Sequence, residues 1–230
     1  MGGCAVINFL FLDADDTLLD FSWAEDQAIH RTYRELGTEM TDEMYARYHV
    51  VNQGYWQTYE RGEITREALL VARHRQMFEE YGLDCDPVLC ENLYRKSLGI
   101  GHHFIPHAVE ILDYLKPRCR LFLASNGVAE TQYSRLESAG IGPYFERLFI
   151  SEEAGDYKPN RAYFDYCFAR IPGFRPEEAA IVGDSLTSDI LGGINAGIQT
   201  IWFNPKNKPG RPDIRPDFEI HDLLELKQLI

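Results

Sequence analysis

Five short apolar segments, each followed by a polar or glycine-bearing turn, constrain the fold of this chain more than any other feature. Segments with helical patterns separate them, and this alternation is typical of an α/β protein with a parallel sheet. The strands of such a sheet are covered on both faces, so they are apolar throughout. The predicted strands are Val6–Leu12, Arg120–Ala124, Leu148–Ser151, Ala179–Val182 and Thr200–Phe203.

The interval between the first two predicted strands contains helical patterns and no convincing strand. A structureless loop of this length is implausible in a compact protein, which favours an inserted helical module. We therefore predict a Rossmann-like α/β core of residues 1–19 and 99–230, with an inserted α-helical domain of residues 20–98. The helix starts predicted in the insert are a capping box at Ser22 and Glu25 and N-caps at Thr41, Thr65 and Asp86.

The composition argues against several classes of partner. Of the 230 residues, 45% are hydrophobic and 26% are charged, as is ordinary for a globular protein. The formal net charge of −13 argues against a nucleic-acid polymer as partner, although a small anionic substrate could bind beside a cation. No apolar stretch approaches the ~18 residues needed to span a bilayer, so we predict no membrane partner.

The cysteines and the first residues favour a cytoplasmic protein. Five scattered cysteines without a Cys-x-x-Cys pair indicate free thiols rather than a disulfide framework or a zinc site. Residues 1–6 contain no basic region followed by an apolar core, which argues against a signal peptide, and Val6 does not fit the myristoylation pattern.

Acidic residues follow two of the predicted strands. Asp13 and Asp15 come directly after the first strand and Asp184 after the fourth, and open parallel sheets bind ligands beyond the carboxyl ends of their strands. Neighbouring carboxylates repel each other, so a cation is expected between them, and oxygen ligands favour Mg²⁺. The alternatives for the first motif are a solvated acidic loop or a set of helix caps. Asp189, five residues after Asp184, could be a simple helix N-cap.

Two weaker motifs follow other strands. Ser125-Asn126-Gly127 offers a hydroxyl group and backbone amides to phosphoryl oxygens, although such a tripeptide is also an ordinary turn. Lys158 precedes Pro159 at a predicted helix start and offers a cation, although an isolated Lys-Pro pair is usually only part of a loop.

Taken in order, the four motifs resemble those of the haloacid dehalogenase superfamily. They are Asp-x-Asp-x-Thr at 13–17, Ser-Asn at 125–126, Lys-Pro at 158–159 and Gly-Asp-x-x-x-x-Asp at 183–189. The resemblance covers the whole chain and implies that the inserted helices are the type 1 cap of that superfamily. The stretches 11–21, 150–160 and 183–197 are further similar to the bacterial pyrimidine 5′-nucleotidases, as are Asn52, Trp56 and the stretch 59–65.

The resemblance implies a phosphatase that forms an aspartyl-phosphate. Asp13 would attack phosphorus, and Asp15 would protonate the leaving oxygen and then deprotonate the water that opens the intermediate. Ser125, the backbone amide of Asn126 and Lys158 would hold the phosphoryl oxygens.

The resemblance also implies a Mg²⁺ cofactor. The carboxylate of Asp13, the backbone carbonyl of Asp15 and the carboxylate of Asp184 would bind the ion. Asp189 would lie outside this set and orient metal-bound water or Lys158.

Asp15 discriminates between reactions within the superfamily. Its dehalogenases and phosphonate hydrolases lack an acid two residues after the nucleophile, so Asp15 favours phosphate esters. A phosphosugar phosphatase or a phosphotransferase that resembles β-phosphoglucomutase remains the enzymatic alternative. A receiver-like signalling module is the non-enzymatic alternative, but it is far shorter and has no helical insert.

The resemblance to nucleotidases favours a small phosphorylated substrate, a nucleoside 5′-monophosphate with a pyrimidine base. Trp56 and Tyr59 could stack on a base, or they could belong to the core of the helical domain. Asn52 could bind a base edge or ribose, or it could be an exposed surface residue.

Overall fold

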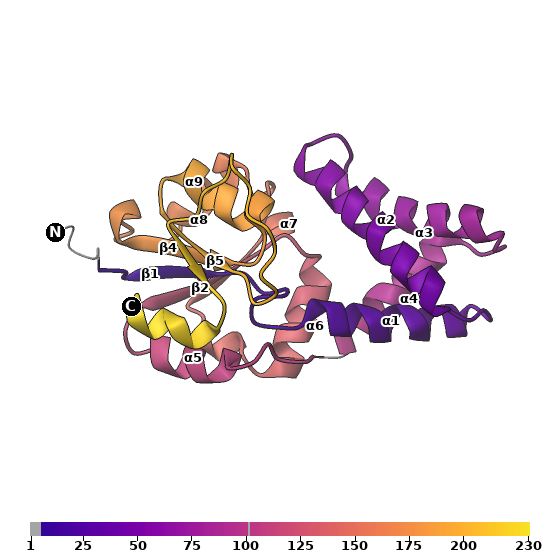
Figure 1. Ribbon diagram of the computed structural model, residues 1–230, viewed down its shortest axis with the longest axis horizontal. Coiled ribbons are helices and arrows are strands. Elements are labelled where there is room, and N and C mark those ends of the chain that lie inside the picture. Colours follow the sequence, from indigo (N-terminus) through magenta and orange to yellow (C-terminus); the bar gives the residue numbers. More distant parts are fainter. Residues whose placement is uncertain (1–5, 101) are drawn as a thin grey trace. The chain divides into compact units, whose positions relative to one another are not determined.

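The computed structural model describes residues 6–100 and 102–230, and the chain divides into two compact units (Figure 1). One unit comprises residues 1–21 and 102–230, and the other comprises residues 22–101. The sequence placed these boundaries at 19/20 and 98/99, and that the second unit acts as a cap stays a prediction. Cys4 and the rest of residues 1–5 lie outside the described residues. Of the four cysteines described, all are free, and Cys90, Cys119 and Cys167 are buried.

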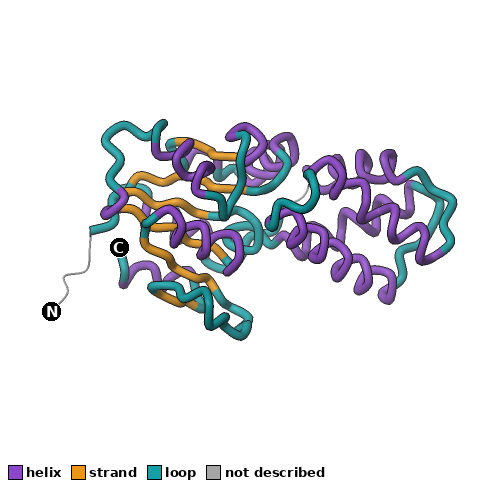
Figure 2. The backbone as a smooth tube through the Cα atoms, turned by 90° about the horizontal axis from the view of Figure 1, so that it is seen from above, coloured by secondary structure: helices purple, strands orange, loops and turns teal. Residues whose placement is uncertain are grey.

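The first unit is built on a parallel sheet, which confirms the predicted α/β fold class. Within the described residues, six strands pair in the order β3-β2-β1-β4-β5-β6. Figure 2 shows the strands lying side by side with helices against them. The strands are β1 (Phe9–Leu12), β2 (Arg120–Ser125), β3 (Arg147–Ile150), β4 (Ala179–Gly183), β5 (Gln199–Phe203) and β6 (Phe218–Ile220).

The central strand β1 is apolar at every position because both of its faces are covered. Phe9 and Phe11 pack on one face of the sheet with residues of the helices at 161–168 and 191–196, whereas Leu10 and Leu12 pack on the other face with residues of the helices at 108–115 and 129–139 and of the turn at 223–228. Each fully buried side chain of this kind stabilises the fold by roughly 1.5–3 kcal/mol. The helices of this unit are α5 (Ala108–Leu115), α6 (Ala129–Ala139), α7 (Ser151–Ala154), α8 (Arg161–Phe168) and α9 (Leu191–Ala196), with the shorter turns η1 (Gly142–Tyr144), η2 (Pro176–Glu178), η3 (Leu186–Ile190) and η4 (Leu223–Gln228).

Two details of the sheet differ from the sequence prediction. The first strand begins at Phe9 rather than at Val6, which is 70% exposed. The edge strand β6 was not predicted, because it has only three residues and one of them, Glu219, is charged and exposed. Short edge strands with charged residues are common at the open side of a sheet.

The second unit is helical. The N-caps predicted for three of its helices are confirmed: Thr41 accepts a hydrogen bond from the Met44 amide, Thr65 from the Ala68 amide, and Asp86 from the Val88 amide. Each such cap stabilises a helix start by about 1 kcal/mol. The helices are α1 (Phe21–Glu35), α2 (Asp42–Glu60), α3 (Arg66–Tyr81) and α4 (Pro87–Ile100).

The capping box predicted at Ser22 and Glu25 is wrong. Helix α1 begins at Phe21, two residues before the start that an N-cap at Ser22 implies, and the backbone N–H of Phe21 donates to Oδ1 of Asp16 at 3.0 Å. Asp16 therefore satisfies an amide at the start of the helix, and Ser22 lies inside the helix rather than at its N-cap. Glu25 is instead buried, with 1% of its surface exposed, and it accepts a hydrogen bond from the Asn52 amide group.

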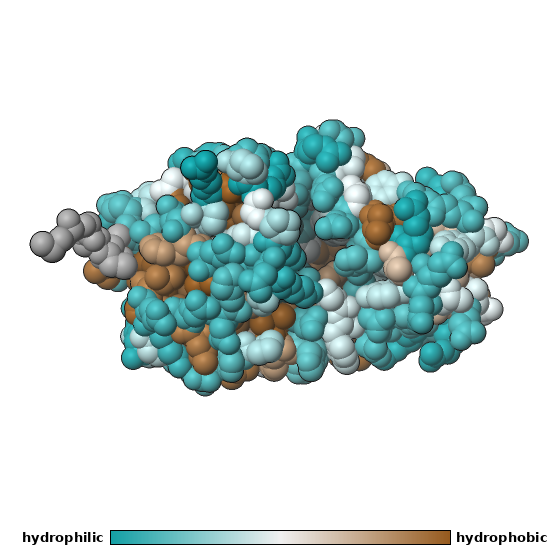
Figure 3. Space-filling model, viewed as in Figure 1, coloured by the Kyte–Doolittle hydropathy of each residue, from teal (hydrophilic) through white to brown (hydrophobic). Residues whose placement is uncertain are grey.

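The surfaces of both units are mixed in character. Figure 3 shows hydrophilic side chains over most of the visible face of the helical unit, while hydrophobic groups are visible between them over the α/β unit. Within the described part of the chain, no helix combines the length and the apolar character that crossing a bilayer requires.

Candidate functional site

The carboxyl ends of β1, β2 and β4 lie together because the three strands pair in parallel. Leu12 of β1 is in register with Leu123 of β2 and Val182 of β4. Asp13 extends this ladder, since its backbone N–H donates to the Val182 carbonyl oxygen at 2.9 Å. The residues that follow the three strands therefore meet at one edge of the sheet, where open parallel sheets bind their ligands.

Lys158 joins two acids at this edge. Its Nζ atom donates to Oδ1 of Asp13 at 2.6 Å, to Oδ1 of Asp189 at 2.7 Å and to the Ala124 carbonyl oxygen at 2.7 Å. Three donors meet three acceptors, so this ammonium group is satisfied although its side chain is only 2% exposed. Asn126 fixes the backbone of Lys158 by accepting from its N–H at 2.9 Å and donating to its carbonyl oxygen at 2.8 Å.

Burial dominates the electrostatics of the cluster. It raises the pKa of Asp13 to about 8, against the opposing charge of Lys158, and it raises the pKa of Asp184 to about 6. Burial also acts to lower the pKa of Lys158, but Asp13 and Asp189 outweigh it, and the net change is upward. Lys158 therefore stays charged, whereas the carboxylates need a further cation to be ionised together near neutral pH.

Three of these carboxylates fit a divalent metal ion. Oxygen atoms of Asp13, Asp184 and Asp189 all lie within 4.8 Å of one another. A set of oxygen donors without histidine or cysteine suits Mg²⁺, and the ion would offset the repulsion among the acids. Both oxygens of Asp189 already accept hydrogen bonds, from Lys158 and from the Ser185 amide at 3.1 Å. Those of Asp13 accept from Lys158 and, at 3.3 Å, from the Thr17 hydroxyl group, so a bound ion would share both carboxylates with these donors.

Asp184 forms an ion pair with a lysine from a distant loop. Lys208, in the loop after β5, donates to Oδ2 of Asp184 at 3.1 Å, and Trp202 donates to its backbone carbonyl oxygen at 2.9 Å. The buried Asn204 pins the Lys208 backbone with hydrogen bonds of 2.8 Å and 3.0 Å. The pattern of proline and charge in this loop does not indicate from the sequence which lysine points back to the sheet.

Asp189 is not a helix N-cap. That position belongs to Ser185, whose Oγ accepts from the Ser188 amide at 3.2 Å, and Asp189 lies within the π-helical turn η3. Gly183 gives Asp189 its space, since a Cβ atom at Gly183 would lie 2.2 Å from the carboxylate carbon of Asp189. The glycine of the Gly-Asp motif is thus required by packing.

In the turn after β2, the side chains of Ser125 and Asn126 form hydrogen bonds within the protein. Ser125, with 1% of its surface exposed, accepts a hydrogen bond from the Gly127 amide at 3.0 Å. The side chain of Asn126 is committed to the Lys158 backbone and to the Ser188 hydroxyl group. That Ser125 and the Asn126 backbone amide bind phosphoryl oxygens stays a prediction.

Asp15 has two partners that the sequence analysis missed. Gln132 of α6 donates to its Oδ2 atom and Arg135 of the same helix donates to its Oδ1 atom. Neither residue belongs to a local motif. The only available signal was their spacing of three positions in the helix that follows the Ser-Asn-Gly turn, which places them on one face.

The three residues predicted to select the substrate lie in the helical unit. Asn52 is buried, and it donates to Glu25 at 2.6 Å and accepts from Arg73 at 2.8 Å, so the alternative of an exposed surface asparagine is wrong. Tyr59 is buried and its ring stands edge-on to that of the half-buried Trp56, with centroids 5.8 Å apart. Their part in substrate choice stays a prediction.

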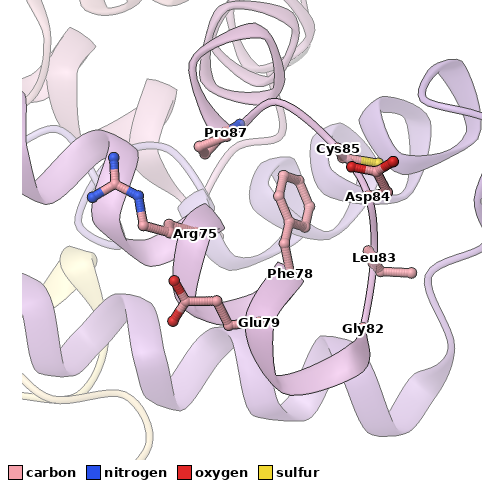
Figure 4. A pocket seen from close by; sticks show the side chains of 8 residues that line it. All are labelled: Arg75, Phe78, Glu79, Gly82, Leu83, Asp84, Cys85 and Pro87. Carbon is pink, nitrogen blue, oxygen red and sulfur yellow. The ribbon is translucent and has the colours of Figure 1, made fainter.

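A surface hollow of about 390 Å³ also lies in the helical unit. Figure 4 shows the ring of Phe78 in its middle, with Arg75 and Glu79 on one side and the segment that carries Asp84 and Cys85 on the other. The residues that line the hollow include none of the predicted site residues.

Comparison with known proteins agrees with this fold. The family model described as haloacid dehalogenase-like hydrolase matches residues 7–197. The chain therefore belongs to the haloacid dehalogenase-like hydrolases, as the sequence motifs indicated.

Several relatives match the chain over nearly its whole length. The chain is 41% identical to the HAD-hydrolase YfnB of Bacillus subtilis over 96% of this chain and 94% of that protein. It is 34% identical to the pyrimidine 5′-nucleotidase PynA of Streptococcus pneumoniae over 95% and 92% of the two chains, and 32% identical to the pyrimidine 5′-nucleotidase YjjG of Escherichia coli over 97% of each. The crystal structure of YfnB bound to magnesium matches with a TM-score of 0.94, covering 97% of this chain and 98% of that one.

Proposed function

We propose that this hydrolase is a Mg²⁺-dependent phosphatase that transfers a phosphoryl group to Asp13 and then hydrolyses the aspartyl-phosphate. The contact between Lys158 and Asp13 in the buried acidic cluster carries the proposal, because it holds one carboxylate at the sheet edge beside a fixed positive charge. Phosphoryl transfer depends mainly on such positioning and charge neutralisation.

Two carboxylates divide the reaction between them. In the first step an Asp13 oxygen forms a bond to phosphorus, the bond to the leaving oxygen breaks, and Asp15 gives its proton to that oxygen. In the second step Asp15 takes a proton from water as the water oxygen attacks phosphorus. The bond from Asp13 to phosphorus then breaks, which releases phosphate and restores the Asp13 carboxylate.

The remaining residues hold charges in place. The carboxylates of Asp13 and Asp184, with the backbone carbonyl of Asp15, would bind Mg²⁺, which supplies positive charge at the phosphoryl oxygens. Asp189 keeps Lys158 in position through its contact of 2.7 Å.

The phosphoryl group itself has a second set of partners. Ser125, the backbone amide of Asn126 and Lys158 hold its oxygens in this proposal. Ser125, the last residue of β2, and Lys158 are almost fully buried, which supports a binding site for these oxygens that is rigid and shielded from water.

For the substrate we propose a nucleoside 5′-monophosphate with a pyrimidine base. The relatives PynA and YjjG, which are named pyrimidine 5′-nucleotidases, support this choice. The partly exposed ring of Trp56 is the side chain of the predicted set that is best suited to stack on a base.

The test is phosphate release from a panel of nucleoside 5′-monophosphates and hexose phosphates, with Mg²⁺ and with excess EDTA. We expect release that requires Mg²⁺ and is fastest from UMP, dUMP or dTMP. Fastest release from hexose phosphates would favour a phosphosugar phosphatase, and isomerisation of a hexose phosphate without net phosphate release would favour a phosphotransferase. Full activity in EDTA would contradict the metal assignment.

A further inference from the structure

Two side chains of α6 hold the carboxylate of Asp15 from both of its oxygens. Gln132 donates its Nε2 to Oδ2 at 2.5 Å, and Arg135 donates its Nη1 to Oδ1. The donors come from residues 117 and 120 positions away along the chain, so the contact exists only in the folded protein. A carboxylate with each oxygen bound to a different donor is fixed both in place and in rotation about its own axis.

Arg135 is a charged residue at a fully buried position. It is among the largest fully buried side chains of the protein, with 0% of its surface exposed. A buried charge is costly unless it is paired, and replacing a whole buried ion pair by well-packed apolar side chains is often neutral or stabilising. Its partners among the described residues are Asp15 and the ring of Phe21, 5.4 Å from the guanidinium carbon. Packing alone therefore does not explain an arginine here, whereas the need for a fixed donor to Asp15 does.

Gln132 needs space that the motif after β2 supplies. A Cβ atom at Gly127 would lie 2.3 Å from Nε2 of Gln132, so any other residue at this turn would displace the amide group. Gln132 is itself 2% exposed. The glycine of Ser125-Asn126-Gly127 thus serves the contact with Asp15, which is a second observation independent of the arginine.

We propose that Arg135 and Gln132 are positioning residues that aim the Asp15 carboxyl group at the leaving oxygen and then at the attacking water. The inference rests on the proposed function, in which Asp15 is the proton donor and acceptor. Neither residue touches the reacting atoms, and both act through Asp15. Proton transfer requires the acid to lie within hydrogen-bond reach of the leaving oxygen, so a small displacement is costly to the rate.

The dependence on the leaving group distinguishes this role from a structural one. The 5′-oxygen of a nucleotide is a poor leaving group and needs the proton of Asp15. The p-nitrophenolate of p-nitrophenyl phosphate leaves without one. A misplaced acid therefore slows the first substrate far more than the second, whereas general damage to the site slows both alike.

The experiment compares kcat/KM for UMP and p-nitrophenyl phosphate in Arg135→Met and Gln132→Leu. We expect a loss of about 10²-fold with UMP and less than about fivefold with p-nitrophenyl phosphate. Asp15→Asn serves as the reference and should show the same selective loss. Arg135→Lys, which keeps a donor and the charge, should recover part of the UMP activity.

Leu136→Ala is the matched control. It removes a buried side chain next to Arg135 on the same helix and should lower stability without changing the ratio of the two activities. If Arg135→Met does not fold, Gln132→Leu and Gln132→Met still test the proposal, because they remove a neutral donor.

If the ratio of kcat/KM for UMP to that for p-nitrophenyl phosphate is unchanged in both the Arg135 and Gln132 variants, the inference is wrong. The proposed function would not be affected by this result. Wild-type protein that releases no phosphate from either ester would contradict the proposed function itself, and with it the inference.

Discussion

The Nζ atom of Lys158 lies 2.6 Å from Oδ1 of Asp13, although 145 residues separate them in the sequence. The four acids of the candidate site, Asp13, Asp15, Asp184 and Asp189, each form an ion pair with a lysine or an arginine. Lys158 pairs with Asp13 and Asp189, Arg135 pairs with Asp15, and Lys208 pairs with Asp184. The exposed fraction of these cations differs, from none at Arg135 to about half at Lys208, and the consequences of removing them should differ accordingly.

Removal of Lys158 should destabilise the fold as well as the reaction. Lys158→Met leaves Asp13 and Asp189 buried without their cation, and breaking a buried pair costs about 3–5 kcal/mol. Urea unfolding at neutral pH measures this loss. The double variant with Asp189→Asn should lose less than the sum of the two single variants, because the two residues are in direct contact. Additive losses, or a loss below about 1 kcal/mol for Lys158→Met, would contradict this view of the cluster.

Removal of Lys208 should strengthen metal binding. Its ammonium group and a Mg²⁺ ion would both be drawn to the Asp184 carboxylate, and Lys208 is half exposed, so the expected gain in Mg²⁺ affinity for Lys208→Met is at most about fivefold. Calorimetric titration of metal-free protein measures it directly. Lys206→Met removes the same charge from the same loop and serves as the control. Equal effects of the two variants would mean that net charge alone is responsible.

The interior of the helical unit should make stability depend on pH. Burial lowers the pKa of His74 from 6.5 to about 4, and Nε2 of this ring lies 2.9 Å from Oε2 of Glu91. Because the unfolded chain binds the proton more readily, the free energy of unfolding is highest above pH 6.5. It should fall by up to about 3 kcal/mol as the pH decreases to 4.

Glu91 acts in the same direction. Burial tends to raise its pKa, but Arg73 and His74 together outweigh this effect and the net pKa is lowered, so its contribution is also lost in acid. Urea unfolding of the wild type and of His74→Gln at pH 7.5 and pH 5 tests the histidine separately. The variant should lose less stability between the two pH values than the wild type does. An equal loss in both proteins would show that His74 does not cause the dependence.

Much of the fold, and the meeting of the candidate site residues at one edge of the sheet, could be predicted because the signals are local in the sequence. A few adjacent residues are enough to predict that Asp13 follows a buried strand and that a turn with glycine and an acid follows another at Gly183. The pairing of parallel strands then brings the two ends together. Thr41 and Thr65 cap their helices for an equally local reason.

The rest depends on contacts between distant residues. Arg135 and Lys208 have no motif around them, and their roles follow only from the acids that they reach across the fold. Glu25 was misread as part of a capping box because its true partner, Asn52, lies 27 residues away on another helix. The edge strand that contains Glu219 was missed because three residues are too few for a pattern.

The central claim is that Asp13 carries the phosphoryl group, and trapping that group tests it most directly. Protein quenched with acid during turnover of UMP and reduced with borohydride should contain homoserine at position 13, as detected by mass spectrometry of the peptide, since an acyl phosphate is reduced to the alcohol. The modification should require both Mg²⁺ and substrate, and Asp13→Asn should show neither modification nor turnover. Continued turnover in Asp13→Asn, or a phosphoryl group trapped on another residue, would contradict the account.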